Sequence, residues 1–365
     1  MLRYCIPRVR NRGHGLGNEL VPWARAFLAA QVINAHLLPP AFGLNRRAYW
    51  KHFNTSPDDW IYHRALQRLL PVVEFNEADY LAHGGGNVVT ALQSFAAAHG
   101  LHKRHLFALV TEGLWGGYSH VQAAREFMRS TLYRSRYAPR NLLQLQARID
   151  PKKILVGMHV RLGDFAAPTN LADYRRAPNT SLPIEWFRNI ADHLQATFGD
   201  DWQLLLVSDG GPEPLQPLLS RYPCIITADI PNGDCSDALA LAQSDLLVCS
   251  ASSYSSLAAT LSDSPYVWFS GNLHEHVEGC YSLHGDGKSV PQNLRTRAAI
   301  AHFLSRPAPG SARGVAVDAD GVIPMTTLEA AARRREWRRW ELDLVRGGVT
   351  PMPVDAESQV RRLGR

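Results

Sequence analysis

The feature that most constrains the fold is the regular alternation of short apolar runs with longer amphipathic segments that begins at residue 151. The apolar runs have the length and composition of buried strands, and the segments between them have helical periodicity. The runs are I-L-V-G-M-H-V, W-Q-L-L-L-V, C-I-I-T-A, D-L-L-V-C-S and Y-V-W-F. Because strands that alternate with helices form parallel sheets covered on both faces, we predict such an α/β domain over residues 151–305.

The rest of the chain predicts one domain before this region and a short extension after it. In residues 1–150, the stretch L-R-Y-C-I-P predicts a strand, N-R-G-H-G-L-G-N a glycine-rich loop, and the apolar residues after it a helix. We therefore expect an N-terminal α/β domain. Residues 306–365 begin with a Pro- and Gly-rich stretch that predicts a linker, followed by a helix over Leu328–Val345 that packs back on the body of the protein through Trp337, Trp340 and Leu344.

Composition restricts the class of protein. A chain of 365 residues suits two domains, and it contains no run of eighteen apolar residues that predicts a membrane span and no secretory signal, so we expect a cytoplasmic protein. Its 5 cysteines lack C-x-x-C pairing, which favours reduced thiols. The formal charge of +6 comes mainly from arginine. For the run R-R-R-E-W-R-R-W we favour a helix with a solvated basic face over a nucleic-acid or membrane-binding site. We expect at most peripheral contact with a membrane.

Polar residues follow three of the predicted strands at the point where each strand ends. They form three groups: His159, Arg161 and Asp164; Ser208 and Asp209; and the serine loop that contains Ser252, Ser253, Tyr254 and Ser255. Asp237 lies at the start of a helix that runs back toward the same edge. In parallel α/β sheets, ligands bind beyond the carboxyl ends of the strands. We therefore expect these residues to share one edge and to form a binding site.

The residue types favour a nucleoside diphosphate. A serine loop that opens a helix offers backbone N–H groups, hydroxyls and the positive end of the helix dipole to an anion, and Arg161 adds a planar pair of donors. A carboxylate such as Asp237 suits a base with two N–H donors, which points to guanine. Each residue also has a structural interpretation: Asp237 and the serines as helix caps, His159 as a buried core residue, and Arg161 with Asp164 as a structural ion pair.

Three motifs, in this order along the chain, resemble those of the GDP-fucose-dependent fucosyltransferases that form α1,2 and α1,6 linkages or O-fucosylate proteins. H-V-R-L-G-D resembles their H-x-R-x-G-D motif, and G-L-G-N-E-L resembles their N-terminal G-x-G-N loop. The run D-A-L-A-L-A-Q-S-D-L-L-V-C-S-A-S-S-Y-S-S is similar to their third motif, an aspartate followed by a strand and a phosphate-binding serine loop. The resemblance covers the N-terminal loop and most of residues 151–262, and bacterial α1,2 enzymes are the nearest type.

The resemblance implies a GT-B architecture of two facing Rossmann-like domains and metal-independent, inverting transfer of fucose from GDP-fucose to a hydroxyl group. The acceptor would be a sugar, a natural product or a protein. The enzyme would need no bound cofactor or metal and would not bind nucleic acid. It also implies that Arg161 binds the β-phosphate, that His159 and Asp237 bind guanine, and that Ser253 and its neighbours bind the phosphates. The backbone of Gly15 and Gly17 and the side chain of Asn18 would close over the diphosphate.

Two departures leave alternatives open. Leu162 stands where many of these enzymes have a second arginine, and A-A-P-T-N has no counterpart of the acidic residue proposed as the base in some of them, so Asp164 is the nearest carboxylate. The same fold acting on another GDP-hexose, and a nucleotide-sugar-binding protein without transferase activity, are the alternatives. We interpret the metal-like motifs V-D-A-D-G, from Val317 to Gly321, as a turn outside the sheet, and H-E-H-V-E-G-C, from His274 to Cys280, as a solvated loop.

Overall fold

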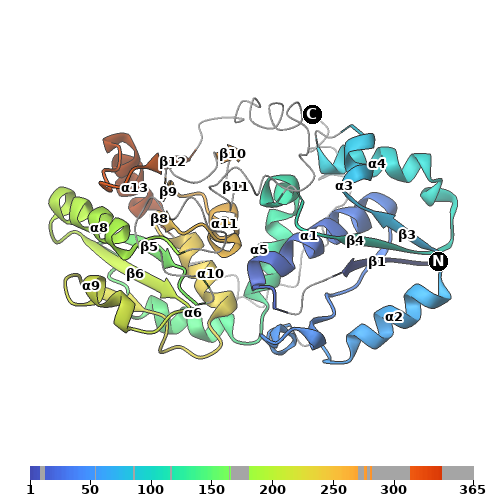
Figure 1. Ribbon diagram of the computed structural model, residues 1–365, viewed down its shortest axis with the longest axis horizontal. Coiled ribbons are helices and arrows are strands. Elements are labelled where there is room, and N and C mark those ends of the chain that lie inside the picture. Colours follow the sequence, from blue (N-terminus) through green and yellow to red (C-terminus); the bar gives the residue numbers. More distant parts are fainter. Residues whose placement is uncertain are drawn as a thin grey trace. The chain divides into compact units, whose positions relative to one another are not determined.

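The computed structural model describes residues 1–8, 13–53, 55–84, 87–115, 117–163, 165, 181–269, 275–277, 280–281 and 313–338. The chain forms two compact units, the first over Met1–Arg136 and the second beginning at Tyr137 (Figure 1). The second unit therefore begins before the expected boundary at residue 151. The reason is the helix α6 (Ala138–Gln146), in which Asn141 donates hydrogen bonds to the carbonyl oxygens of Pro231 and Asn232.

The first unit contains a parallel sheet with the strand order β2-β1-β4-β3. Its strands are β1 (Leu2–Arg8), β2 (His36–Leu37), β3 (Val72–Phe75) and β4 (Leu106–Glu112). Its α-helices are α1 (Leu16–Ile33), α2 (Asp59–Leu69), α3 (Glu77–Ala82), α4 (Val88–Ala98) and α5 (Arg125–Tyr133). Its 3₁₀ segments are η1 (Phe42–Leu44), η2 (Tyr49–Lys51), η3 (Leu101–Lys103) and η4 (Gly117–Ala124). The first unit is therefore of mixed α/β class.

The glycine-rich motif of this unit differs from the prediction of a loop. Helix α1 begins at Leu16, with Gly15 as its N-cap, so Gly17 and Asn18 lie in the first helical turn. Tertiary contacts explain this, because the Tyr49 hydroxyl accepts a hydrogen bond from the Leu16 N–H (2.8 Å) and the Tyr118 hydroxyl donates to the Gly17 carbonyl (2.5 Å). These contacts stabilise a helical conformation in a stretch whose glycines favour a loop.

The second unit contains the predicted parallel sheet, with one strand more than expected and the order β12-β9-β8-β5-β6-β7. Its strands are β5 (Ile154–Val160), β6 (Trp202–Ser208), β7 (Cys224–Ile226), β8 (Leu246–Cys249), β9 (Tyr266–Phe269) and β12 (Gly314–Val317). Besides α6, its helices are α8 (Ile184–Phe198), η5 (Glu213–Leu215), α9 (Gln216–Leu219), α10 (Asp234–Gln243), α11 (Ser253–Leu261) and α13 (Met325–Trp337). A two-stranded antiparallel pair, β10 (Glu275–Val277) and β11 (Cys280–Tyr281), completes the described elements.

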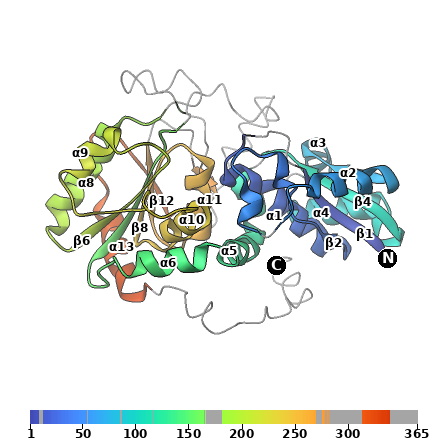
Figure 2. The same ribbon diagram turned by 90° about the horizontal axis from the view of Figure 1, so that it is seen from below.

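Helices cover both faces of this six-stranded sheet. Helices α8, α9 and α13 contribute to one apolar core through residues such as Trp186, Leu218 and Leu328, and this core includes Val156 and Met158 of the central strand β5. On the opposite face, Gly157 of β5 lies against Leu241 and Ser244 at the end of α10. Figure 2 shows α8 and α9 on one side of the sheet and α10 and α11 on the other. The mixed α/β class and the parallel sheets of the prediction are confirmed.

The C-terminal part of the second unit corrects two expectations. Strand β12 pairs with β9, so the V-D-A-D-G motif follows a strand of the sheet rather than lying outside it, although the motif does form the expected turn, with Gly321 at φ +74°. Helix α13 begins before Leu328 and packs on the sheet, but its basic residues are not all solvated, because the Arg338 side chain is buried against Asp245. Trp340 and Leu344 lie outside the described residues.

Two further observations concern the described part of the chain. Cys5, Cys224, Cys235 and Cys249 are free thiols, as predicted for these four cysteines. None of the described helices combines the length and the apolar composition that crossing a membrane requires.

Candidate functional site

The carboxyl ends of the three central strands of the second unit, β8, β5 and β6, form one polar edge, which we call the carboxyl edge. Arg161 follows β5, Ser208 ends β6 opposite Val160, and Ser250 follows β8. Helix α11 begins at this edge because it follows directly after β8, and the first turn of α10 contacts it, since the Tyr254 hydroxyl donates a hydrogen bond to the Asp234 carbonyl (2.5 Å). The structure thus brings together residues that are about ninety positions apart in sequence.

Arg161 is held in place by a residue that follows the neighbouring strand. Its guanidinium forms an ion pair with the Asp209 carboxylate and lies 5.0 Å from the centre of the Phe165 ring. The other oxygen of Asp209 accepts hydrogen bonds from the N–H groups of Leu162 (2.9 Å) and Gly163 (3.1 Å). Asp209 therefore organises the loop after β5, while Asp164, the alternative partner of Arg161, lies outside the described residues. The neighbouring Ser208 hydroxyl accepts a hydrogen bond from the Gly210 N–H (3.1 Å) and shapes the turn after β6.

The serine loop between β8 and α11 has both structural and exposed members. The Ser250 hydroxyl donates to the His159 carbonyl (2.7 Å) and accepts from the Arg161 N–H (3.0 Å), so it joins β8 to β5. Ser252 is the N-cap of α11 and accepts from the Tyr254 N–H (3.3 Å), as the capping interpretation expects. Ser253 and Tyr254 are half-buried, so they are the members of this loop that solvent reaches.

His159 is a buried residue that contacts the start of α11. Its Nδ1 lies 2.7 Å from the Ser255 hydroxyl, and its ring centre lies 5.1 Å from that of Tyr254. Burial lowers the pKa of His159 to about 4, against the opposing effect of the Asp209 carboxylate. The imidazole is therefore neutral at physiological pH. Its contacts with Ser255 and Tyr254 hold the start of α11 against β5.

Asp237 lies in the first turn of α10 and is partly buried. Its Oδ2 accepts a hydrogen bond from the Thr227 hydroxyl (2.9 Å), whereas its buried Oδ1 has no hydrogen-bond partner among the described residues. Burial raises the pKa of Asp237 to about 8, although the Thr227 hydroxyl favours the charged form. The carboxyl group is thus poised to ionise when a ligand supplies further hydrogen-bond donors.

Two residues that support Asp237 were not identified from the sequence. Thr227 follows the short strand β7 and is almost fully buried, and Asn141 of α6 donates to the Pro231 carbonyl (3.1 Å) and to the Ser236 hydroxyl (3.3 Å) in the segment that leads into α10. The position of Thr227 near the end of the predicted strand C-I-I-T-A was a usable signal, because all parallel strands end at the same edge. Asn141 lies far away in sequence, and no local pattern marks it.

In the first unit, the residues of the glycine-rich motif form a separate cluster around the start of α1. Asn45 donates to the His14 carbonyl (3.0 Å) and to Oε1 of Glu19 (2.6 Å). Glu19, which sequence reasoning missed, is fully buried, and burial raises its pKa to about 8. Gly15 and Asn18 are half-buried and Gly17 is buried, so of these three predicted residues Gly17 has the least access to a ligand.

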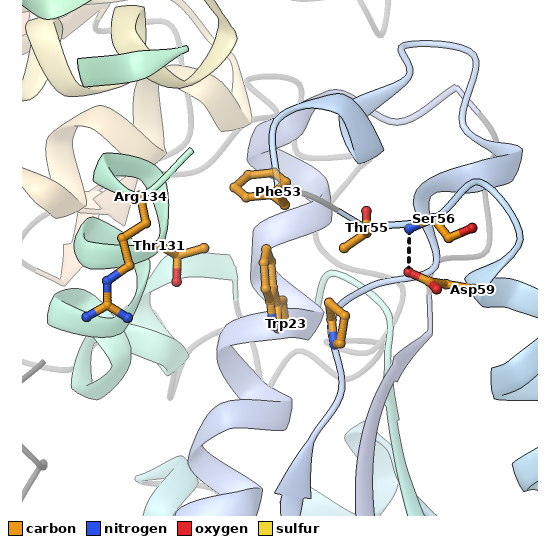
Figure 3. A pocket seen from close by; sticks show the side chains of 8 residues that line it. Trp23, Phe53, Thr55, Ser56, Asp59, Thr131 and Arg134 are labelled. Atoms are coloured by element: carbon orange, nitrogen blue, oxygen red, sulfur yellow. Dashed lines mark hydrogen bonds between the residues drawn. The ribbon is translucent and has the colours of Figure 1, made fainter. Parts of the chain in front are cut away.

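The first unit also contains an open pocket of about 470 Å³ (Figure 3). Its apolar floor consists of Trp23 and Phe53, whose ring centres lie 5.2 Å apart in an edge-to-face arrangement, together with Pro39. Figure 3 shows these two rings between Thr131 of α5 and Thr55. On the rim beyond Thr55, the Ser56 N–H donates to the Asp59 carboxylate (3.0 Å). The pocket thus combines aromatic surface with hydroxyl groups and a carboxylate.

No cluster of His, Cys, Asp or Glu with the arrangement of a metal site occurs among the described residues. The side chains of the H-E-H-V-E-G-C motif lie outside the described part. In the V-D-A-D-G motif, Oδ1 of Asp320 accepts a hydrogen bond from the Val322 N–H (3.1 Å), which is a turn contact.

Comparison of the sequence with protein-family models finds no match, and comparison with curated proteins finds none either. The residues of the carboxyl edge and of the pocket therefore carry the functional argument by themselves.

Proposed function

We propose that the protein is an inverting, metal-independent glycosyltransferase that transfers fucose from GDP-fucose to a hydroxyl group. The observation that carries the proposal is the composition of the carboxyl edge, where an arginine positioned by a carboxylate, the start of a helix and an incompletely hydrogen-bonded aspartate occur together. GDP-fucose presents a group for each of them: a diphosphate for the cation and helix start, and guanine for the aspartate.

The diphosphate is the ligand group that Arg161 and the start of α11 fit best. Because Asp209 holds the Arg161 side chain, the guanidinium loses little conformational freedom when it binds phosphate. The half-buried Ser253 and Tyr254 begin a nine-residue helix, whose N-terminal N–H groups and dipole favour an anion. Together they stabilise the negative charge that develops on the leaving diphosphate.

Guanine is the base that Asp237 selects in this proposal. The Oδ1 atom has no partner among the described residues, and the ring N–H and exocyclic amine of guanine offer two adjacent donors. Adenine and uracil do not present this pair. Hydrogen bonds from guanine favour the charged carboxylate and therefore lower the raised pKa of Asp237 on binding.

The transfer step forms a bond between the acceptor hydroxyl oxygen and the anomeric carbon of fucose. The bond from that carbon to the β-phosphate oxygen breaks at the same time, and GDP leaves with the electron pair. The proton of the acceptor hydroxyl passes to a base, for which Asp164 remains our candidate. Arg161 and the helix start neutralise the departing charge, so we expect transfer to continue in the presence of EDTA.

The aromatic pocket of the first unit is our candidate for the acceptor. The rings of Trp23 and Phe53 suit the C–H face of a sugar ring, and the hydroxyls of Thr55 and Thr131 suit its hydroxyl groups. Replacement of Phe53 by Ala is expected to raise the KM for the acceptor while the KM for the donor stays unchanged. A change in donor KM alone would assign the pocket to another role.

A panel of GDP, UDP, ADP and dTDP in a thermal-shift assay tests the donor assignment. We expect GDP to stabilise the protein most, by roughly 2.7 kcal/mol at ~100 times its dissociation constant. Stabilisation by UDP or dTDP in preference to GDP would refute the guanine assignment. Slow release of free sugar from GDP-fucose then distinguishes an enzyme from a binding protein, and comparison with GDP-mannose distinguishes fucose from other GDP-hexoses.

A further inference from the structure

The amino ends of the strands in the first unit carry exposed apolar side chains that the proposed activity does not use. Leu2 of β1 is 52% exposed, Leu69 at the end of α2 is 77% exposed, Val72 of β3 is 40% exposed and Leu106 of β4 is 45% exposed. Side chains of this size are mostly buried in folded proteins, and a contiguous exposed group of them marks an interaction surface.

The strand register places three of these side chains, Leu2, Val72 and Leu106, on one face of the sheet, and Leu69 lies three residues before Val72. Leu2 pairs directly with Leu106, and its N–H donates to the His105 carbonyl (2.9 Å). Val72 pairs with Ala108, which lies two residues beyond Leu106 and therefore on the same face of the sheet. Leu69 ends α2, and Leu66 of this helix and the C-cap residue Leu70 pack on that face around Ala108. In Figure 1 the amino ends of β1, β3 and β4 lie side by side.

The charged residues in the segments that carry these side chains all have one sign. The segments that form it, residues 1–3, 68–72 and 99–106, contain no Asp or Glu. Arg68, Lys103 and Arg104 are exposed, whereas Arg3 is buried and donates to the carbonyls of Ile33 and His102. At the other end of the same sheet, by contrast, the Arg8 guanidinium is paired with Glu74 (2.8 Å) and Glu112 (3.2 Å). We call the cation-rich apolar end the basic apolar edge.

An anionic lipid surface is complementary to this combination. Leucine side chains enter the boundary between headgroups and acyl chains, while lysine and arginine contact lipid phosphates above it. A second copy of the chain is a poorer partner, because a twofold contact through this edge brings the same cations of both copies together without a carboxylate. An acidic protein would satisfy the cations, but four exposed aliphatic side chains favour the lipid.

We propose that the basic apolar edge binds the surface of anionic membranes as a peripheral contact. The proposal does not depend on glycosyl transfer, since none of its residues belongs to the carboxyl edge of the second unit or to the aromatic pocket. It places the protein at a membrane surface by a few side chains on a folded domain rather than by a spanning helix.

Co-sedimentation of the full chain with lipid vesicles tests the proposal. We expect binding to vesicles in which a third of the phosphatidylcholine is replaced by phosphatidylglycerol, little binding to pure phosphatidylcholine, and weaker binding as salt is raised. Replacing Lys103 and Arg104 together by Gln should weaken binding about 25-fold, at about fivefold for each cation. Replacing Leu69 and Leu106 together by Ser should weaken it at least about tenfold.

The matched controls lie in the second unit, where Leu143 and Met325 are similarly exposed and Arg333 is an exposed cation. Leu143→Ser with Met325→Ser, and Arg333→Gln, should leave binding unchanged, and circular dichroism should show that all variants are folded. Equal binding to both kinds of vesicle, no binding, or the same loss in the controls would each overturn the proposal. So would a wild-type dimer that L69S with L106S converts to a monomer, because the edge would then be a subunit interface.

Discussion

Asp237 and Asp245 lie at opposite ends of helix α10, and the protein treats these two carboxyl groups differently. Asp245 follows the helix at the amino edge of the sheet, where its Oδ2 accepts hydrogen bonds from the Leu155 N–H (2.8 Å) and the Arg338 guanidinium (2.5 Å). Asp237 lies in the first turn of the helix at the carboxyl edge, where its Oδ2 accepts a hydrogen bond from the neutral Thr227 hydroxyl (2.9 Å) and the nearby Asp234 carboxylate has the same sign of charge. The same residue type is thus paired with a charge at one edge and not at the other.

The comparison identifies which observation points to a ligand. In both residues, Oδ1 is buried without a hydrogen-bond partner in the described part of the chain, so this feature alone does not distinguish them. Burial raises both pKa values, to about 8 for Asp237 and about 6 for Asp245, where Arg338 opposes the effect. Asp245 is also fully buried, whereas Asp237 is partly accessible. Besides the free oxygen, which both residues have, partial accessibility and the lack of a cationic partner among the described residues make Asp237 the candidate for binding.

The largest expected effect concerns the ion pair between Arg338 and Asp245 at the amino edge of the sheet. Replacing Arg338 by Ala removes the countercharge of the fully buried Asp245, so we expect the free energy of unfolding to fall by about 3–5 kcal/mol in urea denaturation. The control Arg333→Ala removes an exposed arginine and should cost less than about 0.5 kcal/mol. Asp245→Asn combined with Arg338→Ala should recover part of the loss. Equal stability of Arg338→Ala and Arg333→Ala would show that the ion pair with Asp245 does not stabilise the fold.

The next effect concerns the transfer reaction that we propose for the carboxyl edge. Replacing Arg161 by Ala should lower transfer from GDP-fucose by on the order of 10²–10³-fold at saturating donor, because a donor to the departing phosphate is lost. The fold should remain, since Asp209 keeps its hydrogen bonds from Leu162 and Gly163. Lysine at position 161 should restore activity only in part, because it lacks the planar pair of donors. Near-normal turnover of the alanine variant would show that Arg161 has no role in the leaving group's departure.

Replacing Asp237 by Asn should weaken GDP binding by a few kcal/mol at most, the cost of losing charged hydrogen bonds, with little loss of stability. Discrimination against UDP should decrease with it. The control Asp234→Asn changes another carboxylate in the first turn of the same helix and should not weaken GDP binding, because removing its charge favours the ionised form of Asp237. Calorimetry with both nucleotides decides the matter, since equal GDP affinity in the wild type and in Asp237→Asn would make Asp237 a structural residue like Asp245.

The smallest effect is a dependence of GDP affinity on pH. The free protein holds Asp237 protonated below a pKa of about 8, and guanine lowers this pKa, so binding releases a proton in the window just below pH 8. Affinity should therefore rise as pH rises toward 8, by at most about tenfold for each pH unit, and level off above it. Calorimetry of Asp237→Asn should show no such rise. A wild-type affinity that is constant over this window would show that the carboxyl group does not change its charge on binding.

The parts of the fold that the sequence predicts are those with strong local patterns. Strands β5 to β9 are apolar runs between turns, and their alternation with helices made the parallel sheet predictable. Strand β12, G-V-A-V, is as long as β9 but gives a weaker signal, because glycine and alanine are uncommon in strands, and its pairing with β9 is what shows it to be a strand. Strand β4 was missed because its run L-F-A-L-V-T-E stands among helical segments, and only the sheet shows that it pairs with β1.

The strand topology made the position of the candidate site predictable, but not the contacts within it. That Arg161, Ser208 and Asp237 lie at one edge follows from the rule for parallel strands, and the structure agrees. The partners of these residues do not follow from it. Asp164 was considered for Arg161 because it is near in sequence, whereas the described partner, Asp209, is 48 residues away and reaches it from the neighbouring strand. Thr227 and Asn141 support the segment around Asp237 in the same long-range way.

The close approach of Gly163 to Asp209 has a consequence for how substitutions are tolerated. A Cβ atom at position 163 would overlap the Asp209 carboxylate, so any other residue there must displace the group that holds Arg161. In a library of single substitutions, this glycine should therefore behave like a ligand-binding position, although it has no side chain to offer a ligand. The arginine, the glycine and the aspartate therefore form one mutational unit, in which a substitution at any of the three positions is expected to disturb the other two.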